Sequence, residues 1–142
     1  KPQEAGRNIR ILQKHMEKHP DDVRNMYYSG LEFFNSNDYV NAEMYLKKYI
    51  GLSGWPDEAH MAATKLCVIY ELQAKYKEGL DAAYAALKIK PDWVESYYWL
   101  CKMYYYLTDW KKRVWIQVLA RKRLSSKRSL IGLESNFRGI KK

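Results

Sequence analysis

The chain lacks most of the features that build catalytic, secreted or membrane-spanning proteins. Among its 142 residues there are only two cysteines, and no apolar run approaches the roughly 20 residues needed to cross a bilayer. It contains no glycine-rich phosphate loop, no Ser-His-Asp set with supporting context and no Asp-x-Asp pair. Phosphate cradles, hydrolase triads and metal-nucleotide sites need such patterns. We therefore expect no catalytic residue, no cofactor and no metal ion in this chain.

The two cysteines, Cys67 and Cys101, are 34 residues apart. They admit a disulfide, but a small buried thiol is a common way to fill the contact between two helices. We favour packing, which fits a reducing compartment and predicts a cytoplasmic protein. The chain begins Lys-Pro-Gln-Glu without an initiator methionine or a secretory signal, and we expect it to be part of a longer protein.

The formal net charge of +9 is concentrated at one end. Residues 1–110 hold 14 Lys and Arg against 15 Asp and Glu, whereas residues 111–142 hold 11 against Glu134 alone. Three interpretations remain open for this basic end: a solvated helix face with a tail, contact with an acidic partner or membrane beside Trp110 and Trp115, or nucleic acid, which we favour least. The basic residues of interest are Lys111, Lys112, Arg113, Arg121, Lys122, Arg123, Lys127 and Arg128.

A helix-turn-helix pattern over residues 60–93 recurs along the chain. Thirty-four residues downstream, Leu100, Cys101, Tyr104, Asp109-Trp110 and Ala120 match Leu66, Cys67, Tyr70, Lys75-Tyr76 and Ala86. Upstream, the spacing is 37 residues, and the three extra residues fall in the loop around Ser53-Gly54-Trp55-Pro56. Small residues alternate with large ones at the positions where paired helices touch, which is the mark of a stacked repeat.

This repeat resembles the tetratricopeptide family over residues 4–124. The resemblance implies an all-α fold, a right-handed solenoid of antiparallel helix pairs with about seven helices. Its parts would be a half repeat at 4–20, repeats at 23–56, 60–93 and 94–124, and a basic tail at 125–142 that is a frayed end, a linker or a short docked helix.

Hydrophobic periodicity and turn signals predict the individual helices. We expect Asp21 or Asp22 to cap the second helix and Asp57 to cap the fourth. Arg113 stands where the other repeats have Ala42 and Gly79, so the last pair departs from the pattern. The predicted helices cover residues 4–18, 39–51, 76–89, 93–107 and 110–124, and two more run from the cap at Asp21 or Asp22 to about Asn35 and from the cap at Asp57 to about Leu72.

Aromatic residues make up 15% of the chain, more than the repeat needs. We assign Phe33, Tyr39, Tyr70, Tyr76, Tyr104 and Trp110 to the core. By register, another set faces the groove lined by the first helix of each pair: Tyr27, Tyr28, Phe34, Tyr98, Trp99, Lys102, Tyr105 and Tyr106. Aromatic walls suit a peptide or a glycan chain; the alternative is that several of these rings pack against neighbouring helices.

Two other site types are disfavoured. His15 and His19 have a spacing that can clamp a metal, but Pro20 biases His19 out of the helix, and we favour a solvated helix end. Chaperone-binding tetratricopeptide proteins grip a peptide carboxylate with Lys and Asn residues. In this chain, Tyr27, Leu31, Thr64, Val68, Tyr98 and Lys102 stand at those places, so a chaperone partner is not expected.

A narrower resemblance covers residues 5–110. Its motifs are Arg7-Asn8-Ile9, His19-Pro20-Asp21, Tyr27-Tyr28, Asn37-Asp38-Tyr39, Ala42 and Ser53-Gly54-Trp55-Pro56-Asp57-Glu58. This order resembles the helical region that follows the catalytic domain in some bacterial family 2 glycosyltransferases. The resemblance implies a parent enzyme that transfers sugar from a nucleotide-sugar donor with a metal-binding Asp-x-Asp motif, none of which is present here.

We therefore predict a non-catalytic binding and assembly module. The leading hypothesis is the accessory region of a glycosyltransferase, serving acceptor binding or self-association as a homodimer. The alternative is a free-standing protein–protein adaptor whose basic end docks on an acidic partner or a membrane.

Overall fold

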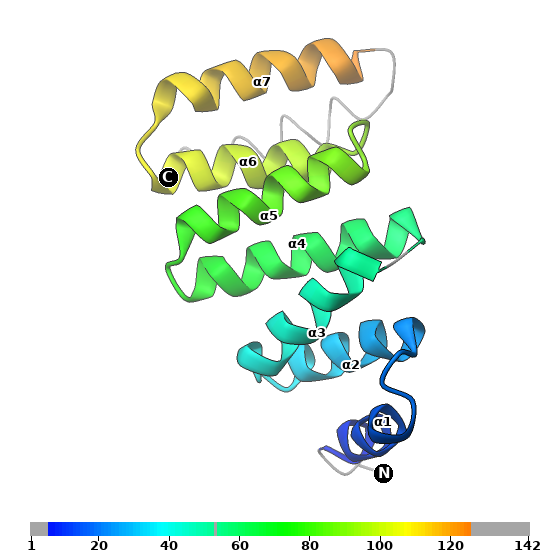
Figure 1. Ribbon diagram of the computed structural model, residues 1–142. Coiled ribbons are helices and arrows are strands. Elements are labelled where there is room, and N and C mark those ends of the chain that lie inside the picture. The colour runs from blue at the N-terminus through cyan, green and yellow to red at the C-terminus, as the bar shows by residue number, and fades with distance from the viewer. Residues whose placement is uncertain (1–5, 53, 126–142) are drawn as a thin grey trace, which may run out of the picture. The chain divides into compact units, whose positions relative to one another are not determined.

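A computed structural model describes residues 6–52 and 54–125 of the chain. Over these residues the chain forms seven α-helices and no β-strand (Figure 1). The helices are α1 (Arg7–Lys18), α2 (Val23–Asn35), α3 (Tyr39–Leu52), α4 (Pro56–Leu72), α5 (Tyr76–Ile89), α6 (Val94–Tyr106) and α7 (Trp110–Leu124). None of the helices in this part of the chain is long and apolar enough to traverse a bilayer.

The chain divides into two compact units, Lys1–Leu66 and Cys67–Lys142. The division falls inside α4, so this helix contributes residues to both units. In unit 1, α2 packs against both α1 and α3, and in unit 2, α6 packs against both α5 and α7. Successive helices are joined by short turns, as a stack of antiparallel pairs requires.

The helix boundaries follow the predicted ones closely, with one correction in capping. Asp22 caps α2 as expected, because its side chain accepts a hydrogen bond from the Asn25 backbone N–H at 3.1 Å. Asp57 does not cap α4, which already begins at Pro56. Proline suits a first helical position because its missing N–H has no helical partner there anyway. Asp57 and Glu58 instead lie in the first turn of α4, where negative charge complements the helix dipole.

The turn inside each helix pair has the same left-handed residue at its centre. Asn37, Ala74 and Thr108 have φ angles of 63°, 54° and 58°, and they are spaced by the repeat lengths of 37 and 34 residues. Asparagine tolerates this conformation, but it costs alanine and threonine energy because Cβ approaches the backbone.

Small residues allow neighbouring helices to approach closely, both within a pair (α2 and α3) and between successive pairs (α5 and α6). A Cβ on Gly30 of α2 would lie 2.7 Å from Leu46 Cδ2 of α3, and one on Gly79 of α5 would lie 2.6 Å from Met103 Sδ of α6. Leu46 and Met103 are themselves fully buried. Glycine thus makes room for a large side chain from the facing helix.

The two cysteines of unit 2 occupy equivalent places. Cys67 Sγ lies 3.7 Å from the Gly79 carbonyl oxygen, and Cys101 Sγ lies 3.8 Å from the Arg113 carbonyl oxygen. Both thiols are free and buried, and burial raises the pKa of each to about 12. The backbone of Arg113 therefore keeps the place that Gly79 has in the preceding pair, although Arg113 is a large residue.

One expected core residue is not in the core. Trp110 was predicted to pack like Tyr39 and Tyr76, which are half-buried, but 65% of its surface is exposed. In unit 2, Tyr76 stacks on Tyr106 at a ring distance of 4.4 Å, whereas Trp110 begins α7 with its ring turned to solvent. The sequence pattern identifies the position but not whether another helix covers it.

The left-handed turn predicts that Thr108→Gly stabilises the chain. Glycine adopts this φ without a Cβ clash, which outweighs its extra unfolded-state entropy and raises the free energy of unfolding by about 1 kcal/mol. Urea denaturation followed by circular dichroism measures the change. In a matched control, Thr64→Gly inside α4 lowers stability by about 0.5 kcal/mol; a destabilising Thr108→Gly contradicts the strain argument.

Candidate functional site

Glu71 of α4 organises a polar cluster in unit 2. Its Oε1 atom lies 2.7 Å from Lys102 Nζ and accepts a hydrogen bond from the Tyr106 hydroxyl, also at 2.7 Å. Lys102 and Tyr106 come from α6, at i and i+4, so they lie on the same side of that helix. The Lys102 and Glu71 side chains are each 21% exposed, and the ion pair is thus only partly solvated.

Aromatic rings surround the Lys102 ammonium. Its Nζ atom lies 5.0 Å from the Trp99 ring centroid and 5.5 Å from that of Tyr98. The Tyr98 and Trp99 rings meet edge to face at 5.3 Å, and Tyr106 stacks on Tyr76 of α5. A cation this close to ring faces is stabilised by their electron density. We call the set Glu71, Tyr98, Lys102, Tyr105 and Tyr106 the Lys102 surface.

Two side chains of this cluster, Lys102 and Tyr106, have raised pKa values. The hydrogen bond to Glu71, with a smaller contribution from burial, raises the pKa of Tyr106 to about 12. Burial alone lowers the pKa of Lys102, but its hydrogen bonds to Glu71 and Tyr98 outweigh this, so the pKa is raised. Near neutral pH the Lys102 ammonium and the Tyr106 phenol therefore both keep their protons while they contact Glu71.

The predicted groove residues divide by burial. Tyr27 and Trp99 are buried, as in the packing alternative: the Tyr27 ring lies tilted against the Tyr49 ring at 5.0 Å, and the Tyr27 hydroxyl donates to Met61 Sδ at 3.8 Å. Tyr28 and Tyr105 are each 39% exposed.

The remaining groove residues are half-buried. They are Phe34 in unit 1 and Tyr98, Lys102 and Tyr106 in unit 2. Phe34 lies beneath the ammonium of Lys65, whose Nζ is 4.6 Å from the ring centroid. The structure thus brings the unit 2 members together around Lys102, while Tyr28 and Phe34 belong to unit 1.

Unit 1 contains a pocket that the sequence did not predict. Its volume is about 360 Å³, and its lining comes from Val23, Arg24, Tyr49, Trp55 and Glu58. The Tyr49 hydroxyl donates to Glu58 Oε2 at 2.6 Å, and Trp55 is 73% exposed. The pocket thus combines an indole, a guanidinium and a carboxylate. The signal for it was the three-residue lengthening of the loop that carries Trp55.

The two histidines at the end of α1 contact each other, and His15 also contacts Asp22. His15 Nε2 pairs with Asp22 Oδ2 at 2.9 Å, and the His15 and His19 rings contact each other at 4.8 Å. The described residues contain no group of three or more His, Cys, Asp or Glu arranged to hold a metal ion. The Asn25 backbone N–H, followed by His15, lowers the pKa of Asp22 to about 2, so this carboxylate serves the helix cap.

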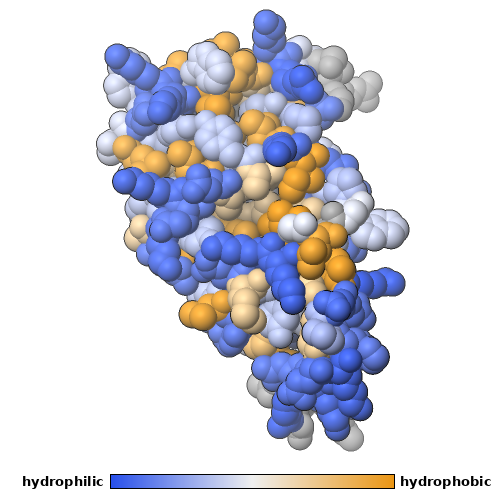
Figure 2. Space-filling view, viewed as in Figure 1, coloured by the Kyte–Doolittle hydropathy of each residue, from blue (hydrophilic) through white to orange (hydrophobic). Residues whose placement is uncertain are grey.

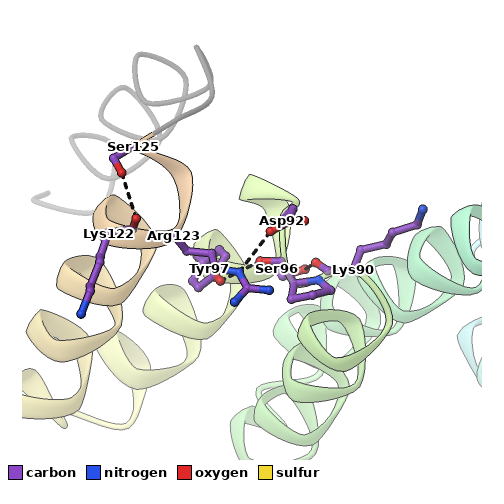
Figure 3. A network of polar contacts seen from close by, with 8 residues as sticks. Lys90, Asp92, Ser96, Tyr97, Lys122, Arg123 and Ser125 are labelled. Carbon is purple, nitrogen blue, oxygen red and sulfur yellow. Dashed lines mark hydrogen bonds and ion pairs between the residues drawn. The ribbon is translucent and has the colours of Figure 1, made fainter.

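The basic residues of α7 differ in the contacts that they make. Arg123 Nε contacts Asp92 Oδ1 at 3.1 Å (Figure 3), and Lys112 Nζ lies 3.6 Å from Asp109 Oδ2. The Arg113 guanidinium lies 5.5 Å from the Tyr105 ring centroid, and Lys111 Nζ lies 5.8 Å from that of Trp110. Lys111, Arg121 and Lys122 are exposed. Lys127 and Arg128 lie outside the described residues.

Comparisons with known proteins identify the fold. No family model matches the chain, and no curated protein matches it. Among solved structures, the chain is similar to MamA AMB-1, a tetratricopeptide-repeat protein, with a TM-score of 0.71 and 16% sequence identity. The match covers 88% of this chain and 67% of that one. The chain therefore has an all-α, tetratricopeptide-like fold.

The hydrogen bond at Glu71 makes a spectroscopic prediction. Glu71→Gln removes the negative charge beside the phenol, so the pKa of Tyr106 falls from about 12 toward its ordinary value of 10.0. Since the folded pKa is the raised one, the stabilisation is complete below pH 10 and is lost as pH rises toward 12. A carbon-13 tyrosine NMR titration measures this.

Tyr97 is the internal control for that titration. Burial raises its pKa, and Glu71 does not contribute to the shift. Its titration should be the same in both proteins. If Tyr106 titrates unchanged in Glu71→Gln, or if Tyr97 shifts equally, the hydrogen bond is not the cause.

Proposed function

We propose that the chain is a non-catalytic tetratricopeptide module that binds a protein or peptide through the Lys102 surface of unit 2. The observation that carries the proposal is the Lys102–Glu71 ion pair set among aromatic rings on α6. Rigid rings bury contact area with little loss of side-chain entropy. A module of this kind acts by positioning its partner.

The chemistry of the surface favours a peptide with an acidic residue. Lys102 has three N–H donors, and a second carboxylate can bind beside Glu71. Tyr98 and Tyr105 offer rings and hydroxyls to the peptide's apolar groups and backbone. Because Lys102 is already held in place, little further ordering is needed when the partner binds.

We further propose that the module is the accessory region of a bacterial family 2 glycosyltransferase, and that a glycan acceptor binds in the Trp55 pocket of unit 1. An apolar sugar face suits the indole, and the hydroxyls suit Arg24 and Glu58.

The two free, buried thiols favour a cytoplasmic location. Sequencing the gene upstream of Lys1 tests the parentage: a nucleotide-sugar domain supports it, and its absence favours the adaptor.

The alternative is a free-standing adaptor whose basic end contacts an acidic partner or a membrane. The observation in its favour is that α7 has six Lys and Arg and no Asp or Glu.

Self-association as a homodimer is a third possibility, and light scattering at low and high salt tests it. A salt-insensitive dimer supports an apolar contact between copies, and a monomer at all concentrations excludes self-association.

The peptide proposal predicts that Lys102→Met weakens binding. The probe is a peptide selected from a random library against the wild-type chain, and fluorescence anisotropy gives its affinity. Loss of a charged hydrogen bond costs about 1.5–3 kcal/mol, so binding weakens about tenfold or more. Lys77→Met, on an exposed part of α5, is the matched control. Equal affinities of the two variants rule out the Lys102 surface as the peptide site.

The pocket proposal predicts saccharide binding that depends on Trp55. N-acetylglucosamine and methyl glucoside should shift the Trp55 indole N–H signal in an NMR titration. Trp55→Ala should abolish binding yet leave stability nearly unchanged, because its side chain is mostly exposed. The acceptor site lies elsewhere if neither sugar shifts this signal, or if Trp55→Ala binds them equally.

A further inference from the structure

The outer face of α7 carries large apolar side chains that none of the described helices of unit 2 covers. Trp110, Val114, Trp115 and Val118 are 65%, 46%, 61% and 57% exposed. Figure 2 shows pale and orange side chains among blue ones over the region of α7. Leaving so much apolar area in water from one short helix is unfavourable, and clustered exposure of this kind marks an interaction surface.

Cations are interleaved with these apolar residues. At 100° per residue, Arg121 falls in the row of Trp110 and Val114, while Lys111 and Lys122 fall beside Val118 and Trp115. Lys111 Nζ lies 5.8 Å from the Trp110 ring centroid. α7 contains no acidic residue, so nothing within this helix neutralises the face. The same surface is thus both apolar and positively charged.

Contacts on the opposite side prevent α7 from turning this face inward. Ile116, Ala120 and Leu124 are fully or almost fully buried. At the end of the helix, Arg123 is paired with Asp92, close to Tyr97, whose hydroxyl donates to the Pro91 carbonyl at 2.7 Å (Figure 3). These contacts fix the orientation of α7 within unit 2, so the residues of its outer face stay on the surface.

We propose that this face, which we call the α7 face (Trp110, Lys111, Val114, Trp115, Val118, Arg121 and Lys122), docks on an anionic phospholipid membrane. A lipid interface presents phosphate charge and an apolar layer together, which is the combination that the interleaved residues match. Tryptophan sits well at this depth, and lysine and arginine extend their charged ends to the headgroups. An acidic protein surface satisfies the cations but leaves the two indoles and two valines without an apolar partner.

The inference sharpens the basic-end alternative and does not depend on the Lys102 surface. The α7 face lies on the outer side of α7, whereas the Lys102 surface is built from α4 and α6. Loss of peptide binding in Lys102→Met and loss of membrane binding in an α7 variant are therefore separate outcomes. A failure of one does not imply a failure of the other.

The test is co-sedimentation of the full chain with vesicles. Vesicles of phosphatidylcholine mixed with phosphatidylglycerol should bind the chain, and vesicles of phosphatidylcholine alone should not. Binding should fall as salt rises from about 0.1 M to about 1 M, because the Debye length shrinks from about 10 Å to about 3 Å. Tryptophan emission should move to shorter wavelength on binding, and Trp110→Ser with Trp115→Ser should remove that shift.

Paired variants separate the two contributions. Lys111→Gln with Lys122→Gln should weaken partitioning about tenfold or more, as each cation near an anionic surface contributes substantially. Trp115→Ser with Val118→Ser should weaken it to a similar extent. The matched control, Val40→Ser with Lys77→Gln, alters an exposed apolar residue and an exposed lysine outside α7 and should bind like the wild type. Circular dichroism verifies that all variants are folded.

Three results overturn the proposal. Equal binding to neutral vesicles shows that charge is not recognised. Unchanged vesicle binding after the Trp115 and Val118 substitutions, together with equally tight binding to polyglutamate, shows that the face recognises acidic protein rather than lipid. No binding to anionic vesicles at low salt excludes the membrane altogether.

Discussion

Close approach of neighbouring helices, within a pair and between successive pairs, is the constraint on which the rest of the structure depends. It requires a residue without a side chain at Gly30, within the α2–α3 pair, and at Gly79, where α5 meets α6 of the next pair, because Leu46 and Met103 occupy the space a Cβ would need. It also requires a turn short enough to bring the chain straight back, which forces the left-handed residues Asn37, Ala74 and Thr108. The left-handed conformation of Ala74 and Thr108 persists because the packed helices on either side of the turn fix the backbone there. The resulting scaffold displays the Lys102 surface, the Trp55 pocket and the α7 face.

The repeat arrangement could be predicted because two independent signals in the sequence indicate it. These are the regular spacing of matching residues and the alternation of small and large side chains at the helix contacts. Helix boundaries followed from turn and proline signals, and the places of Cys67 and Cys101 followed from their equivalence. The predicted cap at Asp57 was wrong because a helix can begin after a capping aspartate or at a proline. The sequence alone does not decide whether α4 begins after Asp57 or at Pro56. The predicted burial of Trp110 was wrong because a repeat pattern assumes a following neighbour, whereas exposure depends on whether that neighbour exists in the described fold.

Side-chain contacts were harder to predict than positions. Helical register placed Tyr98, Lys102 and Tyr106 on a shared side of α6, but it could not reveal that Glu71 from another helix binds two of them. Nor could it separate buried Tyr27 from exposed Tyr28, since adjacent residues differ by only 100° around the axis. The Trp55 pocket is assembled from three helices and a loop, and no local pattern records such an assembly.

Burial of the two thiols gives the molecule a built-in reporter of its own opening. A thiol reacts with an alkylating reagent as the thiolate, and both Cys67 and Cys101 are held protonated inside helix contacts. Modification of either must await a fluctuation that parts its helix from the next. The two alkylation rates therefore report separately on how often α4 parts from α5 and α6 from α7, without any label being introduced. Because Cys67 and Cys101 are buried, a cysteine introduced on the surface for attachment of a probe will react long before either of them.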